Sequence, residues 1–153
     1  MNDPAILVVD DNPDHLELIV MALEDCCATA RIVTASEGAQ ALDFLFGRGE
    51  HAGRDTTRQP RLVILDLKLV RLSGLEVLRA IRADPRTTTL PVVIHSSSVE
   101  DRDVAECYAG GASGYVRKAT DFDDLRAKMR RLHDFWVLGS GPAPSSGGAD
   151  GAT

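Results

Sequence analysis

The chain has few cysteines, few aromatic residues and no long apolar run. Its three cysteines are an odd number, and the adjacent pair Cys26 and Cys27 has poor geometry for a disulfide or a metal site. We therefore expect reduced, structural thiols. No stretch approaches the roughly 18 apolar residues that a membrane span needs, and no basic segment followed by an apolar one marks a signal peptide. These absences predict a cytoplasmic protein that does not act at a membrane.

Basic residues are also scarce. Seventeen lysines and arginines stand against 23 acidic residues, which gives a net charge of −6 and a pI near 5.1. No Lys/Arg-rich run offsets this balance, so we expect no nucleic-acid partner. The four histidines are too scattered along the chain to suggest a zinc site.

The remaining composition is that of an ordinary globular domain. Hydrophobic residues make up 44% and charged residues 26% of the 153 residues, enough for one domain with a proper core. Glycine, serine, alanine and proline fill nearly every position from 139 to 153, and such a segment cannot bury apolar area. We expect one domain over residues 1–138 and a flexible tail over residues 139–153.

Two apolar runs end in acidic residues. Residues 6–9 are followed by Asp10 and Asp11, and residues 62–65 by Asp66. Both runs are typical of buried parallel strands, whose carboxyl ends meet at the same edge of a sheet. Three carboxylates that meet there raise one another's pKa unless a cation is present, and a hard divalent ion prefers such oxygen ligands. The pattern predicts a Mg²⁺ site.

Strand-like and helix-like segments alternate over the whole domain. Strands are predicted near residues 6–9, 30–34, 62–65, 91–94 and 114–117. Helices are predicted after Asn12, from Ser36 to Phe46, from Gly74 to before Pro85, around Val104 to Tyr108, and from about Asp121 to Val137. Asn12 and Ser36 are candidate caps for the first two helices. The last helix carries one apolar stripe of Phe122, Leu125, Met129, Leu132 and Trp136. This order predicts an α/β fold, a (βα)5 flavodoxin-like doubly wound parallel sheet with strand order 2-1-3-4-5.

On these elements the chain resembles the receiver domain of two-component response regulators from Ala5 to Trp136. The resemblance rests on Asp10 and Asp11, on Asp66 followed eight residues later by Gly74, on Ser96, and on the run from Gly111 to Lys118. It implies a signalling protein, not a classical enzyme, that takes part in its own phosphorylation and dephosphorylation.

The resemblance also implies a role for each site residue. Asp66 would accept a phosphoryl group from a sensor histidine kinase, and Lys118 would pair with a phosphoryl oxygen. Mg²⁺ would be held by Asp11, by Asp66, by Asp10 through water and by the backbone carbonyl of Lys68. Ser96 and Tyr115 would act as the switch that changes the surface around the fourth helix, fifth strand and fifth helix.

The chain departs from the common receiver pattern after the lysine. Ala119 stands where most receivers have a proline with a cis peptide bond, which leaves the Lys118–Ala119 bond open between cis and trans. The chain resembles the single-domain regulators that are paired with phytochrome-type kinases. This resemblance rests on the departure at Ala119, on the long loop 47–60 and on the Phe135-Trp136 pair. The implied partner is a red-light-sensing kinase. Phe135, Trp136 and Tyr115 are the expected contacts of a homodimer.

Two other functions remain open from the sequence. A phosphatase of the haloacid dehalogenase type also uses a strand-terminal aspartate, but it needs a second acid two residues later, where this chain has Lys68. A phosphorylation-independent adaptor or a phosphate sink of the same fold is the other alternative. The intact Asp11, Asp66 and Lys118 speak against the adaptor.

Overall fold

The computed structural model describes residues 6–26 and 30–138, and its centre is one parallel sheet of five strands. The strands are β1 (Ile6–Val9), β2 (Ile32–Ala35), β3 (Leu62–Leu65), β4 (Val92–Ser96) and β5 (Gly114–Arg117). They are ordered β2-β1-β3-β4-β5, and every neighbouring pair is parallel. The predicted fold class and strand order are confirmed.

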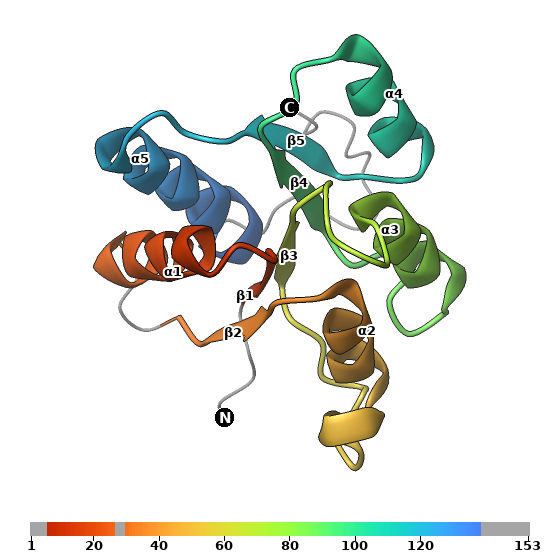
Figure 1. Cartoon of the computed structure of the whole chain (residues 1–153). Coiled ribbons are helices and arrows are strands. Elements are labelled where there is room, and N and C mark those ends of the chain that lie inside the picture. The colour runs from red at the N-terminus through yellow and green to blue at the C-terminus, as the bar shows by residue number, and fades with distance from the viewer. Residues whose placement is uncertain (1–5, 27–29, 139–153) are drawn as a thin grey trace.

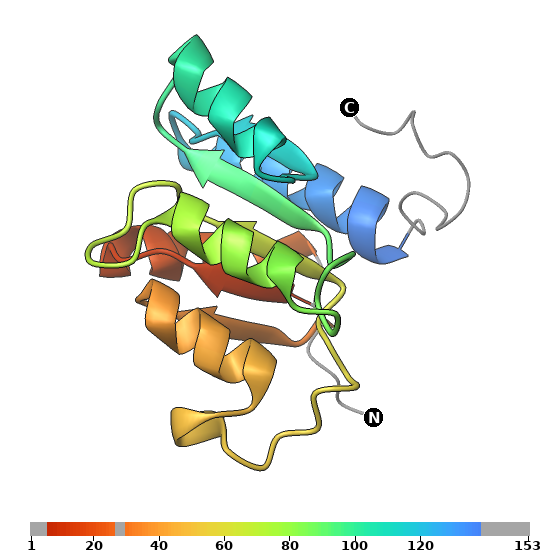
Figure 2. The same cartoon turned by 90° about the vertical axis from the view of Figure 1, so that its right-hand side faces the viewer.

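Helices cover both faces of this sheet. They are α1 (Pro13–Cys26), α2 (Gly38–Phe46), α3 (Gly74–Ala83), α4 (Asp101–Ala109) and α5 (Phe122–Leu132), and α5 continues as a π-helical segment, His133–Leu138. Figure 1 shows α1 and α5 on one face and α2, α3 and α4 on the other. Figure 2 looks onto the face of α2, α3 and α4. No helix within the described residues is long and apolar enough to cross a membrane.

The alternation of side chains along each strand divides the core between the two faces. In β1, Leu7 and Val9 belong to the cluster under α2 and α3, whereas Ile6 and Val8 belong to the cluster under α1 and α5. Both clusters are fully apolar along the central strands, as expected for a parallel sheet buried on both sides. Asp10 continues the parity of Ile6 and Val8, which directs it toward α1 and α5.

Several local predictions are corrected. Strand β2 begins at Ile32 instead of residue 30, and β4 runs beyond residue 94, so that His95 and Ser96 lie within the strand. Ser36 is not the cap of α2: the N-cap is Glu37, without a side-chain hydrogen bond. The Ser36 backbone N–H and hydroxyl instead donate to the side-chain oxygen of Gln40. The Gln40 side chain thus provides the hydrogen-bond partner for both polar groups of Ser36, which precedes the helix.

The predicted N-cap of the first helix is confirmed. Asn12 caps α1, because its side-chain oxygen accepts from the backbone N–H groups of Asp14 and His15. Cys26 and Cys107 are free thiols. Cys27 and the tail 139–153 lie outside the described residues, so the tail stays a prediction.

Candidate functional site

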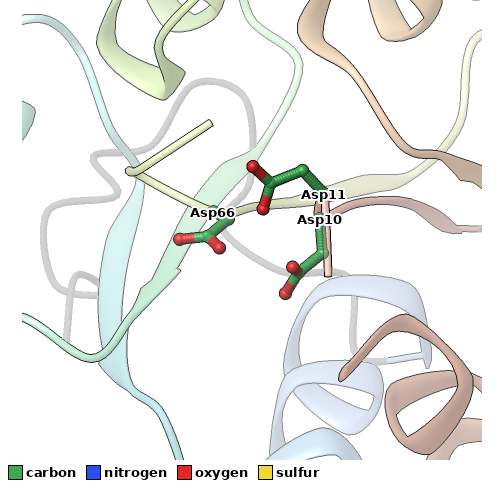
Figure 3. Close-up of side chains that lie close together, drawn as sticks. All are labelled: Asp10, Asp11 and Asp66. Carbon is green, nitrogen blue, oxygen red and sulfur yellow. The ribbon is translucent and has the colours of Figure 1, made fainter. Parts of the chain in front are cut away.

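The three acidic residues meet at the carboxyl edge of the sheet. Strand β1 pairs with β3 so that Val9 stands beside Leu65, and the next residues, Asp10 and Asp66, follow in the same register. The Asp66 backbone N–H donates to the Val9 carbonyl at 3.0 Å. One carboxylate oxygen from each of Asp10, Asp11 and Asp66 lies within 4.8 Å of the others (Figure 3). The predicted cluster is therefore present.

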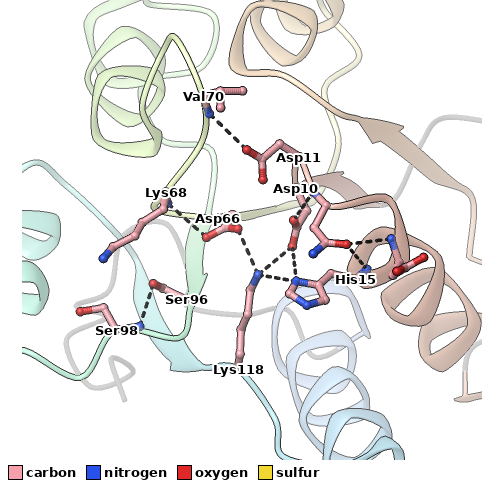
Figure 4. Close-up of polar contacts among 11 residues, drawn as sticks. Asp10, Asp11, His15, Asp66, Lys68, Val70, Ser96, Ser98 and Lys118 are labelled. Carbon is pink, nitrogen blue, oxygen red and sulfur yellow. Dashed lines mark hydrogen bonds and ion pairs between the residues drawn. The ribbon is translucent and has the colours of Figure 1, made fainter.

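Lys118 supplies the positive charge beside this cluster. Its ammonium Nζ donates to Oδ2 of Asp10 and to Oδ2 of Asp66, both at 3.0 Å (Figure 4). Asp10 is only 1% exposed and Asp66 only 7%, so both carboxylates have lost most of their hydration. An ammonium shared between two buried carboxylates offsets charge that would otherwise be costly to bury.

The backbone around Lys118 is held although Ala119 replaces the usual proline. The Lys118 N–H donates to the Ser96 carbonyl at 2.8 Å, which extends the pairing of β4 with β5. The Lys118–Ala119 peptide bond is trans, as are the other described peptide bonds. The lysine side chain thus reaches the acids with a trans bond after it.

Burial and charge act in opposite directions on the two partners. Desolvation raises the pKa of Asp66 above its usual value, and the hydrogen bond and charge of Lys118 reduce this increase without cancelling it. Burial lowers the pKa of Lys118, but the hydrogen bonds to Asp10 and Asp66 outweigh it, so the net pKa is raised. Lys118 therefore stays protonated, and Asp66 becomes a more basic carboxylate than an exposed one.

The loop after β3 is fixed by backbone contacts to the same acids. The Lys68 N–H donates to Oδ1 of Asp66 and the Val70 N–H to Oδ2 of Asp11, both at 3.2 Å. Gly74 closes the loop, since its N–H donates to the Leu67 carbonyl at 2.9 Å. A Cβ at Gly74 would lie 2.2 Å from the Asp66 carbonyl oxygen. The close approach of α3 to the loop requires glycine here.

The start of α3 is fixed by a capping box, which was not predicted from the sequence. The Ser73 hydroxyl accepts from the backbone N–H of Glu76, and the Glu76 carboxylate accepts from the backbone N–H of Ser73. This reciprocal capping box anchors the first turn of α3 directly behind the loop.

Ser96 and Tyr115 face the segment between β4 and α4. The buried Ser96 hydroxyl accepts from the Ser98 N–H at 3.1 Å, and the Tyr115 hydroxyl donates to the Ser98 carbonyl at 3.2 Å. Ser98 is thus held from both sides (Figure 4 shows the Ser96 contact). Within the part of the chain that the structure describes, neither hydroxyl hydrogen-bonds to Asp66 in this arrangement.

Two histidines belong to the site although no role was predicted for any histidine. His15 Nδ1 lies 3.0 Å from the Lys118 ammonium, on the first turn of α1 (Figure 4). His95 is 3% exposed near the end of β4, and burial followed by the charge of Lys118 lowers its pKa to about 4. The predicted cap at Asn12 is enough to place His15 on the helical turn next to Asp10. The contact of His15 with Lys118 depends on the side-chain conformation of His15, which no sequence pattern predicts.

The donor set of the acid cluster suits a hard divalent cation. It consists of carboxylate oxygens only, which is the type of ligand that Mg²⁺ prefers, and one oxygen of each acid lies within 4.8 Å of the others. Among the described residues, the Asp11 carboxylate accepts a single hydrogen bond, from the Val70 N–H. Asp10 and Asp66 both accept a hydrogen bond from Lys118, so Asp11 is the acid of the cluster that Lys118 does not contact.

Comparison with known proteins gives the class. Residues 6–130 match the response regulator receiver domain. The chain belongs to this family and is a phosphoacceptor signalling protein of the two-component type.

Individual relatives agree with this class over most of their length. The probable methanogenesis regulatory protein FilR2 of Methanothrix harundinacea is 36% identical over 132 residues, which cover 86% of this chain and 83% of FilR2. The phosphorylated cyanobacterial phytochrome response regulator RcpA superposes with a TM-score of 0.82 at 31% identity, covering 93% of this chain and 99% of RcpA. The Mn²⁺-bound form of Rcp1, a response regulator of Synechocystis, gives 0.77 at 28% identity, with 88% and 94% covered.

Proposed function

We propose that Asp66 is the phosphoacceptor and that it takes the phosphoryl group from a phosphohistidine of a sensor histidine kinase. The observation that carries the proposal is the buried Asp66 carboxylate at the end of β3, next to an ammonium at 3.0 Å and within a cluster of carboxylate oxygens. This arrangement provides a nucleophile, a fixed positive charge and a cation site around one point.

The transfer follows from these groups. A carboxylate oxygen of Asp66 attacks the phosphorus atom, the phosphorus–nitrogen bond breaks, and the bonding electron pair returns to the imidazole of the donor histidine. The product is an acyl phosphate on Asp66. Lys118 then exchanges its contact with Asp66 for a phosphoryl oxygen, which keeps the transferred charge paired. Positioning and electrostatics supply most of the rate enhancement in such a transfer.

We propose Mg²⁺ as the resident cation. Asp11 and Asp66 would bind it directly, Asp10 through water, and the backbone carbonyl of Lys68 would complete the protein ligands. A bound Mg²⁺ would offset the charge of the phosphoryl oxygens. The similar response regulator Rcp1 has a Mn²⁺-bound form, which supports a divalent metal as the partner of these carboxylates.

The switch is proposed to pass through Ser96 and Tyr115. The Ser96 hydroxyl now accepts from the Ser98 N–H, and it would turn to donate to a phosphoryl oxygen on Asp66. This change would release one of the two contacts on Ser98, and Tyr115 would follow as the segment moves inward. The two states need to differ by only a few kcal/mol for phosphorylation to shift the population.

The proposed kinase is of the phytochrome type, so the input would be red light. The similarity to RcpA, a cyanobacterial phytochrome response regulator, supports this choice. The cytoplasmic location expected from the sequence belongs to the same proposal. The role of a phosphate sink stays an alternative within the family, whereas nothing in the site favours a phosphorylation-independent adaptor.

A homodimer through α4, β5 and α5 is proposed as the assembly. Trp136 is partly buried against the core under α1 and α5, so it contributes less free surface than expected. Phe135 is 40% exposed and packs edge-on against Trp136 at 4.8 Å between ring centroids. Phe135→Asp should shift a dimer to the monomer in light scattering, whereas Met21→Asp, at an exposed position on α1, should not. An unchanged mass for Phe135→Asp would contradict this interface.

Phosphoryl uptake tests the main proposal. The chain is incubated with acetyl phosphate and MgCl₂, and its intact mass is compared with that of Asp66→Asn and with a sample in EDTA. We expect the addition of one phosphoryl group only when both Asp66 and Mg²⁺ are present. Equal uptake by Asp66→Asn would show another acceptor.

A further inference from the structure

The loop between β3 and α3 has an unusual backbone conformation at Arg71. Among residues 6–26 and 30–138, Arg71 is the one residue other than glycine with a positive φ, 66°. This left-handed conformation costs free energy for an L residue, because the Cβ comes too close to the backbone. Such a residue persists only where its surroundings hold it, and such residues gather at functional sites.

The loop is packed on both sides of this position but not at it. Leu69 is 8% exposed and belongs to the core under α2 and α3. Leu72 lies against the start of α2, where a Cβ at Gly38 would come within 3.1 Å of the Leu72 carbonyl oxygen. Between them, Val70 is 57% exposed and the Arg71 side chain 75%. Packing in the core therefore does not explain the conformation at Arg71.

An ion pair holds the exposed part of the loop to α2. The Arg71 guanidinium donates to Oε1 of Glu37 at 3.0 Å. Glu37 is the N-cap of α2, and its side chain makes no capping hydrogen bond within the described structure. A carboxylate is favoured at this end of a helix by the helix dipole. Glu37 thus gives the Arg71 side chain a fixed anchor, which offsets part of the cost of the left-handed backbone.

The neighbouring residue carries this anchoring to the acid cluster. The Val70 N–H donates to Oδ2 of Asp11 at 3.2 Å (Figure 4). Asp11 is the acid that Lys118 does not contact, so the Val70 N–H alone among the described groups hydrogen-bonds to its carboxylate. Groups that hydrogen-bond to a metal ligand orient it, and their loss weakens metal binding. The orientation of Asp11 therefore depends on where the loop holds Val70.

We propose that Arg71, held in its left-handed conformation by Glu37, positions the Val70 N–H and through it orients Asp11 for the cation. Arg71 and Glu37 are then positioning residues, since neither belongs to the acid cluster. The inference rests on the proposed function, because the cation is the proposed Mg²⁺. Other loop conformations would lower the apparent affinity for Mg²⁺ in proportion to their population.

Two substitutions of Arg71 separate its backbone from its charge. Arg71→Ala removes the ion pair but keeps the cost of the positive φ. Arg71→Gly removes both, because glycine adopts a positive φ without strain. The two variants lose the same charge, so a difference between them reports the backbone. Glu37→Gln breaks the ion pair from the other side, and Arg71→Lys keeps it. Arg79→Ala, which removes an exposed arginine from α3, is the matched control.

The dissociation constant for Mg²⁺ is measured by NMR titration of the labelled chain in about 0.15 M KCl, where the Debye length is about 8 Å. We expect Arg71→Ala and Glu37→Gln each to raise it by about two- to fivefold, the contribution of one exposed ion pair. The double variant should show no further increase, because both changes remove the same contact. Arg71→Gly and Arg71→Lys should stay within about twofold of the unmodified chain, and Arg79→Ala should match it.

Equal constants for Arg71→Ala and Arg71→Gly would overturn the inference. If both variants bind Mg²⁺ more tightly than the unmodified chain by the same factor, Arg71 acts through its charge. If neither differs from the unmodified chain, the loop conformation does not affect the cation.

Hydrogen exchange at the Val70 amide without Mg²⁺ gives a second measurement. Val70 is exposed, so protection of its N–H depends on the hydrogen bond to Asp11. Asp11→Ala should abolish the protection, Arg71→Ala should reduce it, and Arg71→Gly should restore it. A Val70 amide that exchanges equally fast in the unmodified chain and in Asp11→Ala would contradict the inference.

Asp11→Ala also separates this inference from the proposed function. If Asp11→Ala binds Mg²⁺ as tightly as the unmodified chain, the proposed metal site is wrong and the inference fails with it. If Asp11→Ala loses Mg²⁺ but Arg71→Ala and Arg71→Gly bind it equally well, only the inference is wrong.

Discussion

Replacing His95 should remove the contribution of this residue to the pH dependence of stability. His95 is 3% exposed, and its pKa in the folded chain is about 4, well below the value of 6.5 for an accessible histidine. The cause is burial first and the charge of Lys118 second. Between these two values the unfolded chain binds a proton at His95 and the folded chain does not. The stability that the neutral histidine contributes is therefore complete above pH 6.5 and is lost as the pH falls toward 4.

The size of the loss follows from the shift. One pKa unit corresponds to about 1.36 kcal/mol, so a shift from 6.5 to about 4 gives about 3 kcal/mol in total. At pH 5.0, about 2 kcal/mol of this is already lost. His95→Leu has no proton to bind and does not incur the loss. The same substitution replaces Nε2, a buried nitrogen with no hydrogen-bond partner in residues 6–26 and 30–138, by an apolar group, so His95→Leu should be at least as stable as the unmodified chain at pH 7.5.

Urea unfolding at pH 7.5 and pH 5.0 measures both effects. All other titrating groups are common to the two proteins, so the difference in unfolding free energy between His95→Leu and the unmodified chain isolates His95. This difference should grow by about 2 kcal/mol in favour of His95→Leu on going to pH 5.0. A difference that stays constant between the two pH values would refute the assignment of His95 as a buried, neutral imidazole.

Two further substitutions test the packing of the site. Lys118→Met leaves two buried carboxylates without their shared ammonium and should lower the unfolding free energy by about 3 kcal/mol at pH 7.5. MgCl₂ should restore part of this loss. A loss below about 1 kcal/mol in urea unfolding would contradict the ion pairs. Gly74→Ala places a Cβ 2.2 Å from the Asp66 carbonyl oxygen and should cost about 3 kcal/mol and slow phosphoryl uptake, whereas Gly114→Ala, with its nearest neighbour at 3.5 Å, should cost far less. Equal unfolding midpoints for the two alanine variants would show that the loop can move away.

The sheet and the acid cluster could be predicted because they depend on strong local patterns. Apolar runs such as Leu62–Leu65 define buried strands without reference to the rest of the chain. Parallel pairing then brings their carboxyl ends together, so the meeting of Asp10, Asp11 and Asp66 follows from topology alone. The contact of Lys118 with Asp66, across 52 residues, was expected only through the resemblance to receiver domains.

The features that could not be predicted, such as the N-cap of α2 and the burial of His95, depend on contacts between side chains and on strand pairing. Ser36 has the right chemistry for a cap, but the Gln40 side chain engages it and Glu37 becomes the N-cap. His95 was expected just beyond the fourth strand, because the apolar run stops at Ile94, yet pairing with Val116 carries the strand through it. Nε2 of His95 is buried without a hydrogen-bond partner among the described residues, which contradicts the usual preference for paired polar groups, and no local sequence pattern predicts it.

Locating the phosphoryl group on the chain tests the central claim most directly. The chain is phosphorylated with acetyl phosphate and MgCl₂, reduced with borohydride, which converts an aspartyl phosphate to homoserine, and sequenced by tandem mass spectrometry. The account predicts homoserine at position 66 and aspartate retained at positions 10 and 11. Homoserine at position 10 or 11, or a phosphorylated chain with no homoserine at all, would contradict it.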